Sequence, residues 1–247
     1  MTCHNWSDAI GPHDRAAIEQ LRSSIIALRA KEDLVHVDGA CEKLYLVLKG
    51  WFGRYREGTG GGRQTLSLTL PGEFLNPEIV YLPNSGAGFT ALTRGKVLAI
   101  DREAARELLR CRPSIADLFG RLLAQDNALV EEEATRLGRR TARERMAHFI
   151  CETVYRLERI ERPSHRGFHC ALTQEQLADV LGLTVVHVNR TMRDLRAMNL
   201  IEWRSQRLKV IDWPGLVRIA RFDASYLQSE QKAEALPKVE LKIAVGV

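Results

Sequence analysis

The side chains best suited to bind a ligand lie close together between residues 186 and 190. Asparagine and arginine each form two hydrogen bonds with a base edge in DNA, asparagine with adenine and arginine with guanine. Asn189 and Arg190 supply these two groups, His187 adds an imidazole that can contact a base or a phosphate, and Val186 fits against a thymine methyl group. We therefore expect these four residues to read DNA bases.

A second group of polar and basic side chains surrounds this segment. Hydroxyl, amide and guanidinium groups bind phosphate oxygens, and such contacts position a protein on DNA without reading its sequence. The residues for which we expect this role are Thr173, Gln174, Thr184, Arg193, Arg204 and Arg207.

Residues 173–195 have the pattern of a helix-turn-helix, which would position both groups. Gly182 stands where a tight turn between two helices needs a positive φ, and Thr184 has the side chain to cap a second helix. Val188, Met192 and Leu195 recur at helical spacing and predict its buried face. Such a unit places its second helix in the major groove. The alternative is an ordinary helical hairpin with an exposed basic face.

Charge and composition support a DNA partner. The chain has 247 residues and a formal net charge of +5, and residues 139–221 alone carry 16 Lys or Arg against 9 Asp or Glu. A basic domain beside a nearly neutral one is typical of nucleic-acid binding. The N-terminus does not have the pattern of a signal peptide, no apolar run has the length of a membrane span, and five scattered cysteines indicate reduced thiols in a cytoplasm.

The first half of the chain combines helical and strand patterns. Residues 14–30 have a helical period, whereas residues 33–101 contain short apolar or alternating runs separated by Gly, Pro and Asn turns, which predict a β-barrel or roll. The glycine-rich residues 57–63 do not have the ending of a phosphate-binding loop and lie between strand-like runs, so a hairpin loop is expected there.

A long helix follows at residues 114–138 and carries two apolar stripes, of which one can pack on the roll and the other on a second copy of the chain. The residues expected to form a dimer contact are Phe119, Leu122, Leu123, Leu129, Val130, Ala134 and Leu137. Burial in a monomer is the alternative. Gly138 can end this helix, and Thr141 and Glu144 form a capping box for the next one.

The C-terminal part ends in a hairpin and a helix. Residues 200–203 and 207–211 predict two strands around a short turn, suited to contact DNA phosphates as a wing. Residues 212–227 predict a last helix. The tail from residue 228 alternates between apolar and polar residues near its end, which is compatible with an added strand or with disorder.

Three segments together resemble the Crp/Fnr family of bacterial transcription regulators: residues 38–50 with 71–74 in the roll, the long helix leading into residues 138–145, and the winged helix-turn-helix. The resemblance covers about residues 20–225. It implies an α+β fold with an N-terminal cyclic-nucleotide-binding-like β jelly roll at 1–112, a dimerisation helix at 113–138, a winged helix-turn-helix at 139–225 and a tail at 226–247. It also implies a homodimer on palindromic double-stranded DNA.

The effector site departs from that of cyclic-AMP-dependent members of the family. Those members hold the ribose with a Gly-Glu pair, where this chain has Asn76 and Pro77, and the phosphate with an Arg-Ser pair, where it has Ser85 and Gly86. A buried phosphate without its arginine would be an unpaired charge, so cyclic AMP is not expected as effector. An altered pocket is expected from Asn76, Glu78, Ser85 and Val130.

The sequence leaves several alternatives for the signal that controls the protein. Only Cys3 lies near the N-terminus, so the cysteine ligands of an iron–sulfur cluster are incomplete. Haem bound by His4, His13 or His36 is one alternative, since imidazole is a ligand for iron. Redox control through Cys170, which lies just before the helix-turn-helix, is a second, and control by abundance alone is a third. No cofactor and no metal site are predicted.

Together these observations predict a sequence-specific transcription regulator rather than an enzyme, acting in the cytoplasm with DNA, a second copy of itself and RNA polymerase as partners. Val185 and Val186 stand where cyclic-AMP-dependent relatives have an Arg-Glu pair, so the resemblance implies a different half-site. A haem-, gas- or redox-gated regulator of the same fold is the first alternative. A small-molecule-binding module whose helix-turn-helix contacts protein is the second.

Overall fold

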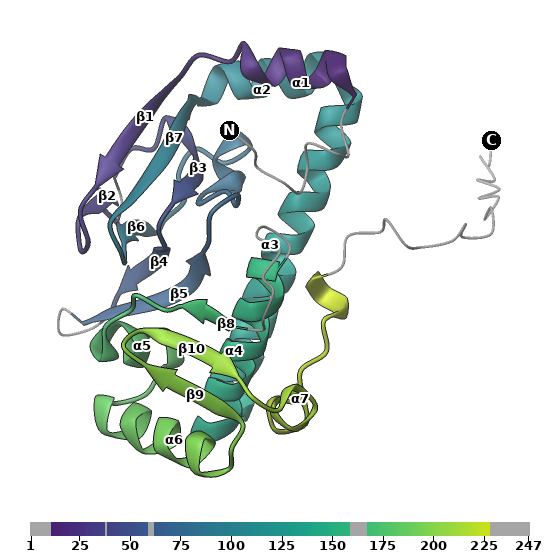
Figure 1. Ribbon diagram of the computed structural model, residues 1–247. Helices are drawn as coiled ribbons and strands as arrows, with labels where there is room; N and C mark the ends of the chain where they lie inside the picture. Colours follow the sequence, from purple (N-terminus) through teal and green to yellow (C-terminus); the bar gives the residue numbers. More distant parts are fainter. Residues whose placement is uncertain (1–10, 38, 59–61, 159–166, 228–247) are drawn as a thin grey trace, which may run out of the picture.

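The structure is a computed structural model, and it describes residues 11–37, 39–58, 62–158 and 167–227. A β-roll and a C-terminal helical unit are joined by two consecutive long helices, α3 and α4 (Figure 1). His4 and the tail from residue 228, for which the sequence suggested roles, lie outside the described residues. No helix in the described ranges combines the length and apolar character that a membrane span requires.

The roll consists of two antiparallel sheets that face each other across an apolar core. The first has the order β1-β7-β3 and the second the order β2-β6-β4-β5. Val47, Phe52, Phe89 and Val97 are fully buried between the sheets, because alternate side chains of each strand point inward. The strands are β1 (Ser23–Leu28), β2 (Asp33–Val35), β3 (Lys43–Lys49), β4 (Phe52–Glu57), β5 (Arg63–Thr69), β6 (Gly88–Ala91) and β7 (Gly95–Asp101).

The start of the chain differs from the prediction of one helix at residues 14–30. The helix α1 spans Pro12–Glu19, and residues 23–28 form strand β1, which pairs with β7 along its whole length. Ser23 and Ser24 with the β-branched Ile25 and Ile26 favour a strand, and the ladder with β7 outweighs the helical spacing. The glycine-rich segment connects β4 and β5, which pair up to Glu57 and Arg63, so the hairpin prediction is confirmed.

Three helices lead from the roll to the C-terminal unit. After the short helix η1 (Pro77–Val80) in the roll, α2 (Arg102–Cys111) is capped by Asp101, whose carboxylate accepts a hydrogen bond from the Ala104 backbone N–H at 2.9 Å. Helix α3 spans Pro113–Arg139, one residue past the expected end at Gly138. Helix α4 spans Ala142–Glu158 and begins with the predicted capping box of Thr141 and Glu144.

The C-terminal unit contains the predicted helix-turn-helix and wing. Its elements are β8 (Gly167–His169), α5 (Gln174–Leu181), α6 (Val185–Ala197), β9 (Ile201–Arg204), β10 (Arg207–Val210), α7 (Trp213–Ala220) and η2 (Ser225–Leu227). The single last helix predicted for 212–227 is therefore divided, because Arg221 adopts a left-handed φ of 47° and ends α7.

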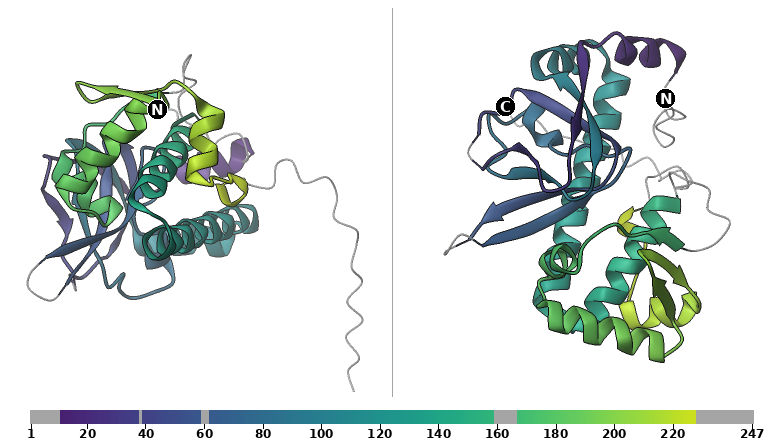
Figure 2. Two further views of the ribbon diagram at one scale, coloured as in Figure 1. Left: turned by 90° about the horizontal axis from the view of Figure 1, so that it is seen from below. Right: turned by 60° about the vertical axis from the view of Figure 1, so that its left-hand side comes forward.

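The roll and the C-terminal unit share a core. Trp51, Leu70 and Leu92 of the roll belong to the same buried apolar cluster as the helix-turn-helix, and the rings of Trp51 and Phe168 lie 5.7 Å apart. The right-hand view of Figure 2 shows the green helix α5 beside the blue strands of the roll, with α6 farther from them. The C-terminal unit is thus held in one orientation against the roll of the same chain.

Candidate nucleic-acid interface

In the helix-turn-helix, the turn and the start of the second helix lie where the sequence predicts. The side-chain oxygen of Thr173 accepts from the Gln176 backbone N–H at 3.2 Å, and the side chain of Gln176 accepts in return from the Thr173 backbone at 2.9 Å. Gly182 has a φ of 60°, and a Cβ there would lie 2.7 Å from a methyl carbon of Leu137. Thr184 caps α6 through the backbone N–H of His187 at 3.3 Å. Glycine is therefore required at the turn for two reasons.

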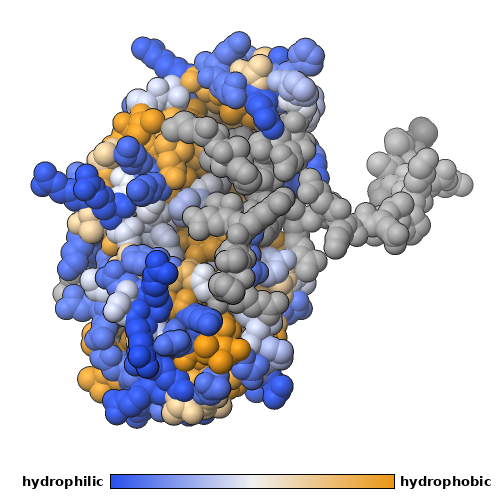
Figure 3. Space-filling view, viewed as in Figure 1, coloured by the Kyte–Doolittle hydropathy of each residue, from blue (hydrophilic) through white to orange (hydrophobic). Residues whose placement is uncertain are grey.

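Helix α6 separates its residues into a buried and an exposed face. Val188, Met192 and Leu195 are buried in the core, as predicted from their spacing. Val186 is 75% exposed, and His187, Arg190 and Arg193 are also exposed on this face. Hydrophilic residues with a few apolar ones between them cover the lower end of the molecule in Figure 3, where Figure 1 places α6.

Asn189 is joined to a residue of the other helix. Its amide nitrogen donates to the side-chain oxygen of Gln174 on α5 at 2.9 Å. This is the nitrogen that an adenine N7 contact would use, so Asn189 must exchange partners to read adenine. The bond also brings one predicted base-reading residue against one predicted phosphate-binding residue.

The wing is a tight hairpin. Ser205 and Gln206 have positive φ angles of 47° and 65° and connect β9 to β10, as in a two-residue type I′ turn. Arg204 and Arg207 flank this turn as a cross-strand pair, and both are exposed. The predicted phosphate-binding arginines of the wing therefore lie at its tip.

Cys170 is not a suitable redox sensor in this arrangement. Its side chain is buried, and burial raises the pKa of the thiol to about 12. Since the thiolate is the reactive form, the low-pKa exposed environment of a reactive cysteine is missing at this residue. The environment of Cys170 in the folded chain therefore argues against the alternative of redox control through this residue.

Asn76 does not line a ligand pocket, which corrects the sequence-based expectation. It is fully buried, and its amide nitrogen donates to the Lys43 carbonyl at 2.9 Å and to the Cys41 sulfur at 3.0 Å. Its oxygen accepts from the Tyr45 backbone N–H at 2.9 Å. All of its hydrogen-bonding atoms are thus used to hold the segment before η1 against β3.

Glu78 and Ser85 lie together, but their partners belong to the chain itself. Ser85 donates to one carboxylate oxygen of Glu78 at 2.6 Å, and Arg54 on β4 donates to the other at 2.8 Å. Asp126 of α3 approaches the same guanidinium at 3.6 Å. Burial raises the pKa of Asp126, and Arg54 partly offsets this. Two carboxylates therefore surround one cation, and neither Arg54 nor Asp126 was expected from the sequence.

The apolar residues of α3 do not share one environment. Phe119 is buried in the core of its own roll, with its ring 5.8 Å from that of Phe74, so it is not available to a second copy and the expected dimer role is corrected. Leu122 and Leu123 are half-buried against the same core. Four other residues were expected at the dimer contact. Leu129 is half-buried, Val130 is 37% exposed, Ala134 is exposed and Leu137 packs on Gly182.

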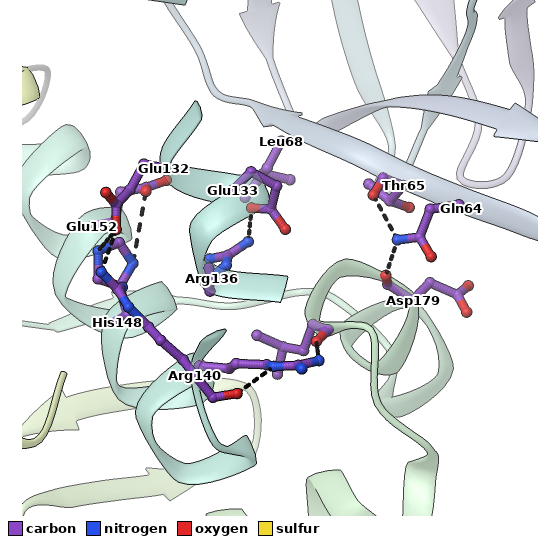
Figure 4. A network of polar contacts seen from close by, with 12 residues as sticks. Gln64, Thr65, Leu68, Glu132, Glu133, Arg136, Arg140, His148, Glu152 and Asp179 are labelled. Atoms are coloured by element: carbon purple, nitrogen blue, oxygen red, sulfur yellow. Dashed lines mark hydrogen bonds and ion pairs between the residues drawn. The ribbon is translucent and has the colours of Figure 1, made fainter. Parts of the chain in front are cut away.

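A buried polar network occupies the junction of α3 and α4 (Figure 4). His148 is buried, with its Nε2 3.1 Å from a carboxylate oxygen of Glu132 and its Nδ1 4.0 Å from one of Glu152. Arg140 also contacts Glu132, and Arg136 pairs with Glu133. Burial raises the pKa of Glu133 to about 7 and lowers the pKa of His148 to about 3. The sequence analysis did not anticipate this network.

The histidines considered for haem are not grouped with other ligands. His13 is exposed on α1, and His36 lies with its Nδ1 3.3 Å from a carboxylate oxygen of Asp33. Within residues 11–37, 39–58, 62–158 and 167–227, no three His, Cys, Asp or Glu side chains lie close enough together to hold a metal ion.

Two family models match this chain, one in each half. The cyclic nucleotide-binding domain matches residues 25–111, and the Crp-like helix-turn-helix domain matches residues 144–219. Between them they include the roll, the predicted effector segment and the interface described above.

Known proteins and structures agree with these matches. The nitrogen fixation regulation protein FixK of Rhizobium meliloti is 30% identical over 177 residues, which cover 72% of this chain and 77% of FixK. The transcriptional activatory protein AadR of Rhodopseudomonas palustris is 27% identical over 205 residues, which cover 82% of this chain and 83% of AadR. The structure of FixK2 from Bradyrhizobium japonicum shares the fold, with a TM-score of 0.73 and 22% identity over 81% of this chain and 98% of that chain. This chain belongs to the Crp/Fnr family of DNA-binding transcription regulators.

Proposed function

We propose that this regulator binds a two-fold-symmetric operator as a homodimer, with one copy of α6 in each of two successive major grooves. The observation that carries the proposal is the exposed face of α6, where Val186, His187, Arg190 and Arg193 project from a helix whose start is fixed by Thr184. In a symmetric dimer of this kind the half-sites lie one helical turn apart, about 34 Å along the DNA.

The residues of the interface take different roles. Arg190 donates two hydrogen bonds to guanine, Asn189 reads adenine after it leaves Gln174, and Val186 contacts a thymine methyl group. His187 contacts a base or an adjacent phosphate. Phosphate contacts come from the helix starts, α6 and the wing, and they involve Thr173, Gln174, Thr184, Arg193, Arg204 and Arg207.

The dimer forms along α3. Leu129, Val130 and Ala134 are apolar residues that their own chain leaves half-buried or exposed, and Tyr81 and Leu82 are two large exposed apolar residues beside η1. A second copy of α3 would cover such a stripe. Val130→Glu is expected to shift the protein toward monomer in sedimentation equilibrium. Ala124→Glu, at an exposed position on a different face of α3, is the matched control and is expected to leave the dimer unchanged.

Cyclic AMP is not the effector in this proposal. A cyclic phosphate is anionic, whereas the region around Glu78 and Ser85 already holds two carboxylates against the single cation of Arg54. Asn76 is committed to the backbone of β3. The chain is therefore expected to bind its operator without an added nucleotide, and isothermal titration with cyclic AMP is expected to give no heat of binding.

As a regulator, the protein acts through RNA polymerase in the cytoplasm, where the promoter DNA lies, and carries out no catalysis of its own. The direct test is selection of DNA from a random pool by the purified, effector-free chain at near-physiological salt. A two-fold-symmetric site bound at about 10⁻⁸ M or tighter is expected. Absence of an enriched sequence, also after addition of cell extract, would contradict the proposal.

A further inference from the structure

Arg145, in the first turn of α4, has a side chain that contacts three separate segments of the chain. Its Nη2 donates to the Leu137 carbonyl of α3 at 2.6 Å, and its Nε donates to the Arg140 carbonyl at 2.9 Å. Its Nη1 donates to the Leu181 carbonyl at 3.3 Å and to the Gly182 carbonyl at 3.1 Å. These four hydrogen bonds, which we call the Arg145 clamp, join α3, the junction before α4 and the turn of the helix-turn-helix.

The acceptors of the clamp lie at the C-terminal ends of α3 and α5. The last carbonyls of a helix have no N–H partner within that helix, and a cation is favoured there by the helix dipole. The Thr141 backbone N–H, which would continue the hydrogen bonding of α3, donates to the Glu144 carboxylate at 2.8 Å instead. The guanidinium of Arg145 therefore caps two helices at once.

The turn of the helix-turn-helix packs directly against the clamp. A Cβ at Gly182 would lie 2.7 Å from a methyl carbon of Leu137 and 3.3 Å from Nη1 of Arg145, so the backbone of the turn touches both side chains. Thr184 follows two residues later and caps α6 through the His187 backbone N–H at 3.3 Å. The start of α6 is thus fixed within two residues of a carbonyl that the clamp holds.

The clamp connects the helix-turn-helix to α3, whereas other polar contacts of the C-terminal unit connect different parts. The ion pair of Arg156 with Glu73 leads to the roll of the same chain. The pair of His148 with Glu132 joins α4 to α3 but includes no residue of the helix-turn-helix. Residues 140 and 141 separate α3 from α4, so the angle between these helices depends on contacts across the junction. In a dimer formed along α3, that angle sets the distance of each α6 from the two-fold axis.

We propose that Arg145 positions the two copies of α6 for one spacing of the half-sites. This inference rests on the proposed dimer on two-fold-symmetric DNA, and it assigns the selectivity for spacing to a residue that does not itself contact DNA. One added base pair moves a half-site by about 3.4 Å along the duplex and rotates it by about a tenth of a turn. Two α6 helices on clamped junctions cannot follow this change, whereas two helices on loosened junctions can.

The test measures dissociation constants of the full chain for three duplexes. They are the selected operator, the same operator with one base pair inserted at its centre, and a single half-site. Arg145→Met removes every donor of the clamp. Arg145→Lys keeps the charge but lacks the planar group that reaches several carbonyls at once. The matched control is Arg139→Met, which removes one positive charge from an exposed position in the last turn of α3.

For wild type, the inserted base pair is expected to weaken binding by about 100-fold, to the level of the single half-site, because only one α6 can then engage. Arg139→Met is expected to keep this ratio. For Arg145→Lys the ratio is expected to fall to about tenfold, and for Arg145→Met it is expected to fall further, because both copies of α6 still reach their half-sites on the longer operator. The ratio does not depend on the fraction of folded protein, so a variant that folds less well still gives a result.

Two outcomes would overturn the role of Arg145. One is a wild-type ratio for Arg145→Met, which would mean that the clamp only stabilises the fold. The other is an equal fall of the ratio for Arg139→Met, which would mean that the charge of the junction matters and the four carbonyl contacts do not. A wild-type protein that binds the intact operator no better than the single half-site would contradict the proposed dimer itself.

Discussion

Arg156 of α4 forms a two-pronged ion pair with Glu73 of the roll. Its Nε lies 3.0 Å from one carboxylate oxygen and its Nη2 lies 2.5 Å from the other, while the same guanidinium contacts Glu152 at 3.0 Å and the Leu68 carbonyl at 2.6 Å. Burial disfavours the charge of Arg156, but Glu73 and Glu152 outweigh this effect and hold its pKa above the usual range. This pair joins the sensor domain to the DNA-binding unit across 83 residues of sequence.

Removal of Arg156 is expected to destabilise the protein strongly. Arg156→Met leaves Glu73, Glu152 and a backbone carbonyl without their cation, and breaking a buried pair from one side costs about 3 kcal/mol or more of unfolding free energy. Urea denaturation of the full chain measures this loss. Glu73→Gln, whose side chain is more exposed, is expected to cost less. Strictly additive effects in the Arg156→Met, Glu73→Gln double variant would contradict the pairing.

The side chain of Gln176 forms two hydrogen bonds, one that caps α5 and one that joins α5 to the roll, and substitution can separate their effects. Gln176→Ala removes its bonds to the Thr173 backbone and to the Leu92 carbonyl, with an expected loss of about 1–2 kcal/mol in unfolding free energy. Gln176→Glu keeps the acceptor for Thr173 but places a carboxylate against the Leu92 carbonyl, so it should weaken the contact with the roll while α5 still begins at Thr173.

The control is Gln64→Ala, at an exposed residue whose bond to the Asp179 carbonyl is long at 3.4 Å. A change of about 0.5 kcal/mol or less is expected for it, measured by thermal or urea unfolding. If Gln176→Ala were no more destabilising than Gln64→Ala, the buried bond to Leu92 would not contribute to the docking of the two domains.

His148 is expected to make stability depend on pH. Burial is the largest cause that lowers its pKa from 6.5 to about 3, and Arg140 and Arg136 act in the same direction against Glu152. Below about pH 6.5, the imidazole of His148 is therefore protonated in the unfolded chain, whereas it stays neutral in the folded chain down to about pH 3. Stability from this residue is present above that pH and is lost as the pH falls toward 3, at up to about 1.4 kcal/mol per pH unit.

His148→Phe isolates this contribution, because an aromatic ring can still pack against Phe222 and Tyr226. Glu133, with its pKa raised from 4.5 to about 7, has the opposite effect: its contribution falls as the pH rises between these values. Since Glu133 is present in both proteins, the difference in unfolding free energy between pH 4 and pH 6 reports on His148. Parallel pH profiles for wild type and His148→Phe would contradict this assignment.

Local signals in the sequence located the DNA-binding unit well. The cap at Thr184, the turn at Gly182 and the spacing of Val188, Met192 and Leu195 are all determined within a few residues, and the structure confirms them. The N-terminal strand β1 was missed because its pairing with β7 is about 70 residues distant in the chain, and short apolar runs do not distinguish helix from strand.

The sequence-based predictions that were wrong concern the residues that a side chain contacts in the folded chain. Phe119 and Val130 lie on the same face of α3 by helical spacing, yet the roll covers the first and leaves the second 37% exposed. Asn76 stood at a predicted ligand position but satisfies backbone groups of β3. The sequence around Arg156 and the sequence around Glu73 contain no pattern that predicts their ion pair. Such outcomes depend on tertiary packing, which spacing along the chain does not encode.

The most direct test of how this regulator recognises DNA is a parallel selection with wild type, Arg190→Ala and Arg196→Ala. Arg190 is expected to contact a guanine, whereas Arg196, exposed in the last turn of α6, serves as the matched control. We predict that Arg190→Ala loses about 1–3 kcal/mol of binding free energy and accepts other bases at one position of each half-site, while Arg196→Ala selects the wild-type site. If Arg190→Ala recovered the wild-type site with unchanged discrimination at every position, α6 would not read DNA in the way proposed.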